Sequence, residues 1–419
     1  MDNVSLDTLE SCDIEITNTA GKTIPIKDQV MSLSIYESIF QPLVTCEISL
    51  TDAISIAHDL PIIGEERLTV RIKSTNASEE STYEFILHGL DDIVNDSQNR
   101  HQIYSIMGTS VESLADAKIS VQKGYTDTYE AIVNDIMTSF IGTSKKVTVG
   151  SAKGIHQIVV PNLSPLKAID FVRQRSVSNM YGYSPFLFYE TSRGFYFTDV
   201  VSRFSEARSE NATAITKIFY PNATSDLNET TDDSWKNIVS YETVSKHDTL
   251  TKTHNGAFYN NLNKFDLFKK QFVELETKLS DVKDSFDLVE AGEYNTSDMI
   301  SNMSKAGATN YMVFVDGSRS DSHIDFIGQK NTFATLLFQT IVNAEFHGDT
   351  MMEAGKVIYL DIKKPTGLTG DEPDQEDTRQ SGFYMISKLA HHVTFASEPS
   401  LRTSCELVKG ANKSIKGNM

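Results

Sequence analysis

Short runs of alternating apolar residues are the feature of this sequence that most constrains its fold. Between Asp13 and about Ser110 these runs recur, and turn residues bound each of them. Alternation with a period of two is typical of a half-buried strand, and strands at regular spacing favour a closed barrel or a sandwich. We therefore expect one antiparallel β domain over residues 1–110, with strands near 14–16, 30–35, 44–50, 68–72, 83–87 and 103–107.

Helical and strand patterns alternate after residue 110, which predicts an α+β domain over 111–234. The best-marked helix begins with Ser164 as N-cap and Pro165 at its first helical position. The other expected elements are a helix over 129–140 capped by Thr128, a strand at 158–160, an aromatic hairpin over 185–197 and an exposed polar connection at 222–234.

A second β region begins near Trp235 and repeats three strands of the first region in the same order. The matched segments are 64–72 with 355–362, 85–90 with 384–389 and 103–107 with 404–408. Strand patterns are low in information, so chance similarity is the alternative to an internal duplication. Duplication predicts a second, similar barrel over 235–270 and 331–412, in which the acidic loop 367–380 enlarges one hairpin connection.

Residues 265–289 allow two interpretations. Their apolar side chains are spaced by three and four, which predicts an amphipathic helix or a coiled-coil seam. However, Asn255-Gly256 followed by aromatic residues can equally open a long hairpin strand. We place the strand at 256–270 and any helix from residue 271 onward, so that 271–330 is an insertion of uncertain structure. The predicted fold class is α+β and mainly β: two similar, tube-like antiparallel β-barrels with inserted α+β domains.

The chain is acidic, with 57 Asp and Glu residues, 38 Lys and Arg residues and a formal net charge of -19 at pH 7. Binding of nucleic-acid backbones depends on clustered Lys and Arg. We therefore do not expect a protein that grips DNA. Solubility alone explains such a charge, and the functional alternative is an acidic lining along a passage through which DNA slides without sticking.

The cysteines and the apolar segments bound the cellular context. Cys12, Cys46 and Cys405 are an odd number without CxxC spacing, so we expect reduced, mostly buried thiols rather than a disulfide framework or a zinc knuckle. The first twelve residues lack the apolar stretch of a secretory signal. No apolar run approaches the roughly 20 residues of a membrane span. We expect a protein made in the cytoplasm, with no membrane span.

Several segments resemble chemical motifs without completing them. Residues 21–23, Gly-Lys-Thr, resemble the end of a phosphate-binding loop, but Ile16 stands where that motif requires glycine. His391 and His392 are adjacent in an expected strand, so their side chains point to opposite faces and do not readily share one metal. Residues 347–349, His-Gly-Asp, have no third ligand nearby in the sequence. We assign no catalytic, cofactor-binding or metal-binding residue, and we expect neither a cofactor nor an enzyme.

An ordered set of segments resembles the baseplate hub family of contractile (myovirus) phage tails, which is akin in architecture to the VgrG-like spike hubs of type VI secretion. Each match alone is weak, and the order makes the set more specific. Residues 290–328 match nothing in that family. The segments are 35–40 leading to 60–66, 164–169 with the aromatic hairpin, 256–259 with Phe265-Asp266, and 346–350 followed by Gly355.

The resemblance implies a homotrimer in the tail baseplate of a virion. Two similar barrels per chain would then form a ring of pseudo-sixfold symmetry, which matches a sixfold tail tube on one face and a threefold spike on the other. The implied partners are the central spike, held by the inserted domains, the tail-tube or tube-initiator proteins, and surrounding baseplate wedge proteins. DNA would pass through without specific binding.

Three other functions remain as alternatives. One is the spike hub of a secretion or extracellular contractile injection system, because the same ring serves such machines. The second is a cell-wall hydrolase, although no catalytic segment is recognisable. The third is a carbohydrate- or receptor-binding tail β-protein, which the aromatic clusters at 181–189 and 195–197 support.

Overall fold

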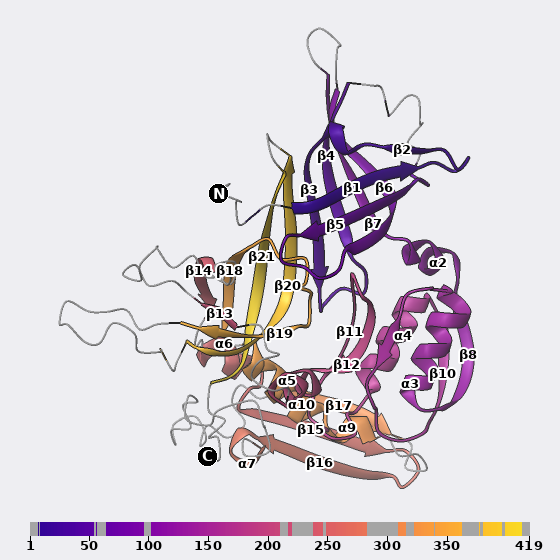
Figure 1. Ribbon diagram of the computed structural model, residues 1–419. Helices are drawn as coiled ribbons and strands as arrows, with labels where there is room; N and C mark the ends of the chain where they lie inside the picture. Colours follow the sequence, from indigo (N-terminus) through magenta and orange to yellow (C-terminus); the bar gives the residue numbers. More distant parts are fainter. Residues whose placement is uncertain are drawn as a thin grey trace, which may run out of the picture.

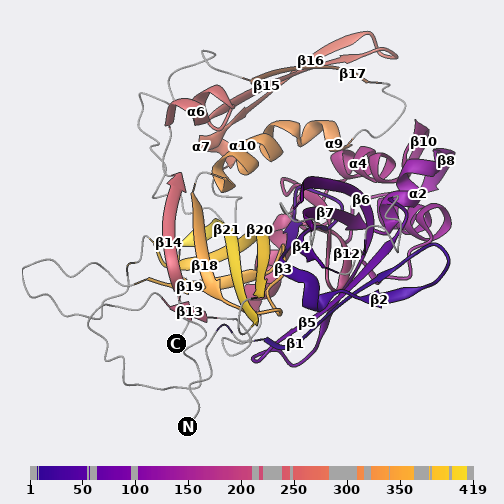
Figure 2. The same cartoon turned by 90° about the horizontal axis from the view of Figure 1, so that it is seen from above.

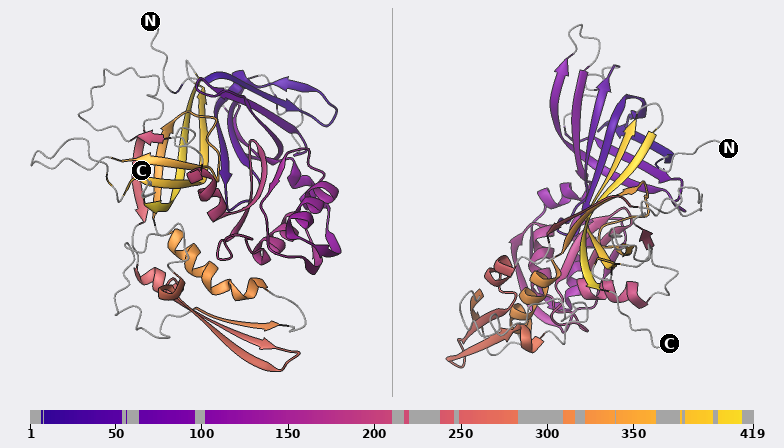
Figure 3. Two further views of the ribbon diagram at one scale, coloured as in Figure 1. Left: turned by 60° about the horizontal axis from the view of Figure 1, so that its bottom comes forward. Right: turned by 90° about the vertical axis from the view of Figure 1, so that its left-hand side faces the viewer.

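The computed structural model of the protein describes residues 7, 9–53, 56, 64–95, 102–209, 217–219, 238–245, 249–282, 309–315, 322–338, 340–362, 377, 380–395 and 399–412. These residues form two β units, a middle domain of helices and small sheets, and an insertion in which helices accompany a separate sheet (Figure 1). The insertion lies at the end of the molecule away from the first unit (Figure 3).

The first unit is an antiparallel sheet in the order β3-β4-β7-β6-β5-β1-β2. Buried residues alternate with more accessible ones along β4 and β5, which is why the period-two runs form strands with one apolar face. The predicted hairpin loop is confirmed, and Gly21 has a φ of +81° there. The strands are β1 (Leu9–Thr17), β2 (Thr23–Pro25), β3 (Val30–Ser38), β4 (Thr45–Asp52), β5 (Arg67–Ser74), β6 (Ser81–Asn95) and β7 (Gln102–Ser110), with a short 3-10 turn η1 (Lys27–Gln29).

The second unit is a sheet in the order β14-β18-β21-β20-β19-β13. Its pairs are antiparallel except β13 with β19, which are parallel. β13 lies within the range predicted for the α+β domain, so that segment instead adds a strand to the second unit. The strands are β13 (Lys217–Phe219), β14 (Ile238–Ser245), β18 (Ile341–His347), β19 (Val357–Asp361), β20 (Gly382–Phe395) and β21 (Pro399–Asn412).

The two units repeat one another strand by strand. The order β3-β4-β7-β6-β5 in the first unit matches β14-β18-β21-β20-β19 in the second, with the same order along the chain and antiparallel pairing throughout. The predicted pair of similar antiparallel β units is therefore confirmed.

The repeat extends to the register of individual residues. The β6–β7 register shifts between Leu87 and Gly89, and the β20–β21 register shifts at the equivalent place, between Ile386 and Lys388. Bulges are specific features of a strand pair, so their coincidence indicates one plan used twice. A second shift also coincides. The β3–β4 register shifts between Val30 and Ser32, and the β14–β18 register shifts between Ile238 and Ser240. Next to these shifts, Val30 pairs with Leu50 and Ile238 pairs with Phe346.

The register corrects two of the three sequence matches. The match of 85–90 with 384–389 agrees with the strand pairs. Arg67 pairs with Ile86, and Val357 pairs with Met385, which is the equivalent of Ile86. Arg67 and Val357 are therefore equivalent, and the sequence match of Gly64 with Gly355 is displaced by one residue. The third match is displaced by two residues, because segment 404–408 is equivalent to 105–109.

The middle domain follows β7 and contains the predicted helices and hairpin. The Thr128 side chain accepts a hydrogen bond from the Ala131 amide, and Pro165 stands at the first turn after Ser164, as expected. The elements are α2 (Glu112–Lys118), β8 (Val121–Asp127), α3 (Tyr129–Asp135) continuing as the π-helix η2 (Ile136–Ile141), β9 (Val147–Val149), β10 (His156–Leu163), α4 (Pro165–Arg175), β11 (Phe186–Thr191), β12 (Gly194–Asp199) and α5 (Val200–Ser209).

The insertion interrupts the second unit between β14 and β18, where the first unit has only the short connection from β3 to β4. Its sheet has the order β16-β15-β17, and α10 packs on β15 (Figure 2). The elements are α6 (Thr249–His254), β15 (Tyr259–Asp266), β16 (Gln271–Lys278), α7 (Leu279–Val282), β17 (Thr309–Val315), α9 (Ser322–Asp325) and α10 (Ile327–Leu337). α10 thus extends into the range predicted for the second barrel.

The helix expected from residue 271 is wrong, because β16 begins there. Phe265 and Phe272 face each other across the β15–β16 hairpin, and Phe268 lies in the turn between the strands. The three-four spacing therefore counts residues on two strands and a turn rather than one helical face. The polar connection at 222–234 and residues 367–376 of the acidic loop lie outside the described residues.

Candidate functional site

The joint between the two units is a pair of strands rather than a linker. Residues 388–394 of β20 pair antiparallel with 32–38 of β3, whereas the other end of β20 pairs with β19. His392 Nδ1 lies 2.9 Å from Ser34 Oγ across the joint. Val393 and Leu401, from the far ends of β20 and β21, belong to the apolar core of the first unit. The joint is therefore part of a core, although each unit also has its own apolar cluster.

Eight strands thus form one continuous row, in the order β14-β18-β21-β20-β3-β4-β7-β6 (Figure 2). One face of this row packs on the cores, and the other carries mainly polar side chains that are neighbours across the strand pairs. We call the second face the polar face. Its residues include Ser34, Tyr36, Glu47, Ser49, Asp91, Ser105, Ser240, Glu242, Asn343, Glu345, Lys388, His392, Arg402, Ser404 and Glu406.

Acidic side chains outnumber basic ones on the polar face. Lys388 pairs with Glu406 at 2.8 Å, and Arg402 lies 3.4 Å from Glu345. Among the described residues, Glu47 and Glu242 have no ion-pair partner, so the face keeps an excess of negative charge. An open depression of about 880 Å³ lies on this face, where β3, β14, β18, β20 and β21 contribute its lining.

A buried carboxylate ties both units to the middle domain. Glu37, at the end of β3, accepts hydrogen bonds from Tyr83 Oη in the first unit, the Ser192 amide in the β11–β12 turn and the Ala354 amide before β19. Burial raises the pKa of Glu37 to about 8, helped by the negative charge of Glu353 and opposed by these three donors.

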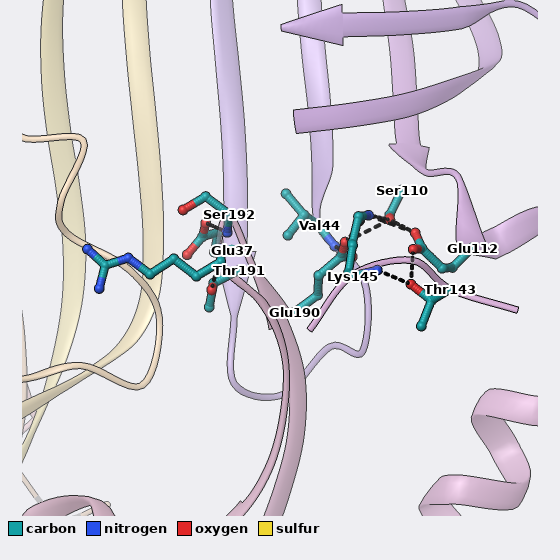
Figure 4. A network of polar contacts seen from close by, with 10 residues as sticks. Glu37, Val44, Ser110, Glu112, Thr143, Lys145, Glu190, Thr191 and Ser192 are labelled. Atoms are coloured by element: carbon teal, nitrogen blue, oxygen red, sulfur yellow. Dashed lines mark hydrogen bonds and ion pairs between the residues drawn. The ribbon is translucent and has the colours of Figure 1, made fainter. Parts of the chain in front are cut away.

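A second buried polar network joins the first unit to the middle domain (Figure 4). Lys145 Nζ lies 2.6 Å from Glu190 and 2.8 Å from Glu112, and it also donates to Ser110 Oγ. Glu190, on β11, in turn accepts from the Val44 amide at 3.0 Å. Lys145 thus links β7, α2 and β11, and Glu190 extends the network to Val44, the residue before β4.

The charges of this network stabilise one another. Burial raises the pKa of Glu190, and Lys145 offsets only part of that effect. Burial is also the largest single effect on Glu112, but there the attraction of Lys145 and hydrogen bonds from Lys145, Ser110 and Thr143 together outweigh it, and the pKa is lowered. The pKa of Lys145 is raised, because its two carboxylate partners outweigh its own burial. The network thus favours a charged lysine held between two acids.

The residues that the sequence analysis discussed as chemical motifs lie apart. His391 is fully buried and bonds to Thr403, whereas His392 lies on the polar face, so the two histidines point to opposite faces as predicted. His347 Nδ1 lies 2.7 Å from Asp7. Within the described residues, no cluster of His, Cys, Asp and Glu could hold a metal ion. All three cysteines are buried and free.

Sequence reasoning missed Glu37, Lys145 and Glu190. One signal pointed to Glu190, because it is a charged residue at the end of an aromatic run that forms a wholly buried strand. Lys145 has no comparable signal, since its partners lie far from it along the chain. No helix in the described part of the chain combines the length and the apolar character needed to span a bilayer.

Two solved structures share this fold over nearly the whole chain. The tail protein of Neisseria meningitidis has a TM-score of 0.58 at 8% sequence identity, covering 95% of this chain and 96% of that one. The 43 kDa tail protein of prophage MuSo2 from Shewanella oneidensis has a TM-score of 0.53 at 10% identity, covering 95% and 98%. The chain therefore has the fold of these tail proteins.

A third structure matches at a lower TM-score of 0.45, with 10% identity, 93% of this chain and 74% of that chain covered. It is the c3393 protein of E. coli, a component of the type VI secretion system. No protein-family model and no curated protein matches the sequence.

Proposed function

We propose that this protein is the central hub of a contractile-tail baseplate, where three copies form a ring between the tail tube and the central spike. The observation that carries the proposal is the strand-by-strand repeat of one sheet plan, with two coincident bulges, within a chain that has a tail-protein fold. Because each chain has two similar β units, a ring of three copies contains six of them. Such a ring offers six similar contacts to a sixfold tube and three identical contacts to a threefold spike.

The mass of the purified protein tests the ring. Native mass spectrometry and light scattering should give three copies per particle, alone or with the spike protein of the same genome. A particle that stays monomeric, and that binds neither the spike nor the tail-tube protein, overturns the proposal.

The polar face is proposed to line the channel of the ring. Its unpaired acids, Glu47 and Glu242, would repel the phosphates of passing DNA and keep it from adhering. Reversing both to lysine should slow DNA ejection from assembled particles, with a stronger effect at low salt. Asp13→Lys, on the exposed side of β1, is the matched control and leaves ejection unchanged. Equal ejection rates for both variants contradict the channel assignment.

A structural role without enzymatic activity is part of the proposal. The rival function of a cell-wall hydrolase predicts a cleared band in a peptidoglycan zymogram. The rival function of a carbohydrate-binding protein predicts binding on a glycan array. The carbohydrate-binding function has less support, because most aromatic residues of the β11–β12 hairpin are buried in two apolar clusters. The hub of a secretion or extracellular injection system is the remaining alternative, and the partner that co-purifies with the ring distinguishes it.

A further inference from the structure

The turn between β15 and β16 exposes four large apolar side chains within residues 267–273, which we call the hairpin tip. The exposed fractions are 57% for Leu267, 73% for Phe268, 59% for Phe272 and 42% for Val273. Single exposed apolar residues are common on protein surfaces, whereas a contiguous group of them marks a contact with another protein or with a membrane. The hairpin tip therefore has the character of an interaction site.

Two lysines stand among these apolar side chains. Lys269 and Lys270 are exposed, and neither has an ion-pair partner among the described residues. No acidic residue lies between Asp266 and Glu274, although acids outnumber bases in the chain as a whole. The hairpin tip is thus both apolar and cationic, on a protein that is otherwise acidic.

The turn is held in shape by its own hydrogen bonds. Asp266 is buried at the end of β15, and its Oδ1 accepts from the amides of Phe268 and Lys269, each at 2.9 Å. Lys270 completes the turn with a φ of +51°. A loop that is already fixed in this way loses less conformational entropy when it binds.

The hairpin tip lies at an extremity of the molecule, at the end away from the first unit (Figure 3). A protein partner would have to supply a cavity that matches this narrow turn. A bilayer is soft and closes around an apolar tip without a preformed cavity. Its interface also places apolar acyl chains directly below anionic phosphates, which is the order that an apolar tip with neighbouring lysines requires.

We propose that the hairpin tip binds the surface of an anionic phospholipid membrane. Leu267 and Phe268 enter the boundary between headgroups and acyl chains, and Lys269 and Lys270 lie at the phosphates. This contact goes beyond the proposed hub function, and it gives the insertion a lipid partner in addition to its protein partners.

The strand behind the tip limits the depth of insertion. Glu274 and Glu276 are exposed on β16, beyond the tip. Anionic headgroups would repel these carboxylates, so the sheet stays outside the bilayer while the turn enters the interface. The contact is therefore peripheral, and it leaves the rest of the insertion to the protein partners of the hub.

Cosedimentation of the purified full-length protein with vesicles tests the contact. The protein should bind vesicles of phosphatidylcholine and phosphatidylglycerol, mixed at about 2:1, at least about tenfold more tightly than vesicles of phosphatidylcholine alone. Added salt should weaken the binding, because it screens the lysines from the phosphates. Absence of binding to the anionic vesicles, or equal binding to both kinds, overturns the proposal.

Two double variants separate the apolar part of the tip from the charged part. Leu267→Ser with Phe268→Ser removes the apolar side chains. Lys269→Gln with Lys270→Asn removes both charges, and asparagine tolerates the positive φ of position 270. Each double variant should weaken binding at least about tenfold and leave the melting temperature unchanged, because the replaced side chains are exposed. Unchanged affinity in either variant contradicts the proposal.

The matched control removes the same chemistry from another exposed site. Ile155 is 73% exposed in the middle domain, and the side chain of Lys153 is exposed two residues before it. Ile155→Ser with Lys153→Gln should therefore leave vesicle binding unchanged. An equal loss of binding in this control would indicate non-specific adhesion and would overturn the assignment to the tip.

Tryptophan fluorescence tests insertion directly. Trp235 is the single tryptophan of the chain, so Phe268→Trp combined with Trp235→Phe places the only indole at the tip. Its emission should shift to shorter wavelength when anionic vesicles are added, because the ring leaves water for the interface. Emission that stays unshifted while the protein is bound contradicts insertion of the tip.

The outcomes distinguish this contact from the proposed function. A trimer by mass that ignores anionic vesicles overturns the membrane contact and leaves the hub standing, whereas a monomer that binds the vesicles but no tail protein overturns the hub alone. Suppose instead that the parent chain ignores vesicles and that Leu267→Ser with Phe268→Ser loses the spike protein or changes the number of copies per particle. The hairpin tip is then a protein contact, and the membrane proposal fails.

Discussion

The two β units share one backbone plan but meet the middle domain through opposite chemistry. The Ser110 amide bonds to the Val44 carbonyl in the first unit, and the equivalent Lys409 amide bonds to the Thr340 carbonyl in the second. Around that shared bond, the first unit has the Lys145 network. The second unit instead packs apolar side chains, including Val357, Met385 and Val408, against Tyr189 and Phe204 of the middle domain.

The difference shows which part of the repeat is constrained. Two bulges and the strand register around them are preserved between the units, because they fix the geometry of the sheet. Side chains at the contact with the middle domain have diverged, because the two units offer different surfaces to one asymmetric neighbour. Three substitutions test this difference between the units. They change Lys145 in the polar contact, Gly355 in the apolar contact and Glu37, which contacts both units.

Removing the charge of Lys145 should have the largest effect. Lys145→Met leaves Glu190 and Glu112 buried without their cation, which should lower the free energy of unfolding by about 3–5 kcal/mol. Urea denaturation of the full chain measures this loss. Lys123→Met is the matched control, because Lys123 and Asp135 are an exposed pair whose loss costs less than about 1 kcal/mol. Equal losses for the two variants would show that the buried network adds no specific stability.

The apolar contact is probed at Gly355. A Cβ at Gly355 would lie 1.9 Å from Tyr189 Oη, and its φ of +77° is one that side chains rarely adopt. Gly355→Ala should therefore lower the free energy of unfolding by about 2–4 kcal/mol, through overpacking and backbone strain together. Gly21→Ala has nearly the same φ, +81°, and no atom within 4 Å of the new Cβ, so it should cost only about 1 kcal/mol. The thermal unfolding midpoints of both variants give the comparison, and equal shifts would refute the contact with Tyr189.

Glu37 contacts both units and should make stability depend on pH. Its pKa is about 8 in the folded protein, against 4.5 as the ordinary value, so the folded state holds a proton that the unfolded state has lost. The free energy of unfolding should therefore fall as pH rises between these values, by at most about 1.4 kcal/mol per pH unit from this group. Glu37→Gln should flatten that part of the profile, whereas Glu47→Gln on the polar face should keep the parent slope. Denaturation at pH 5, 6.5 and 8 measures both, and an unchanged slope in Glu37→Gln would exclude this carboxyl as the source.

Local patterns predicted the elements whose cause is local. The cap at Thr128, the helix start at Pro165, the hairpin loop at Gly21 and the alternating strands depend on neighbours in the sequence, and each is found, although the Ser164 side chain makes no capping hydrogen bond. The helix expected after residue 271 failed for the same reason, because spacing alone does not distinguish one helical face from two strands and a turn.

Long-range features were predicted less completely. The duplication was found from strand patterns, but its register was displaced in two matches, because alternating strands slide by one or two residues without losing their apolar pattern. The joint between β3 and β20 links residues more than three hundred positions apart. The partners of Lys145, likewise, are brought to it only by the folded middle domain, so no local spacing could have identified them.

The shared strand β20 has a mechanical consequence. Because it is hydrogen-bonded to β19 at one end and to β3 at the other, pulling the units apart along the row must break several backbone bonds together instead of straightening a flexible tether. Each chain then behaves as a stiff arc. Strain imposed on an assembled particle would be absorbed elsewhere, at seams between chains or in the insertion that projects from the β14–β18 connection.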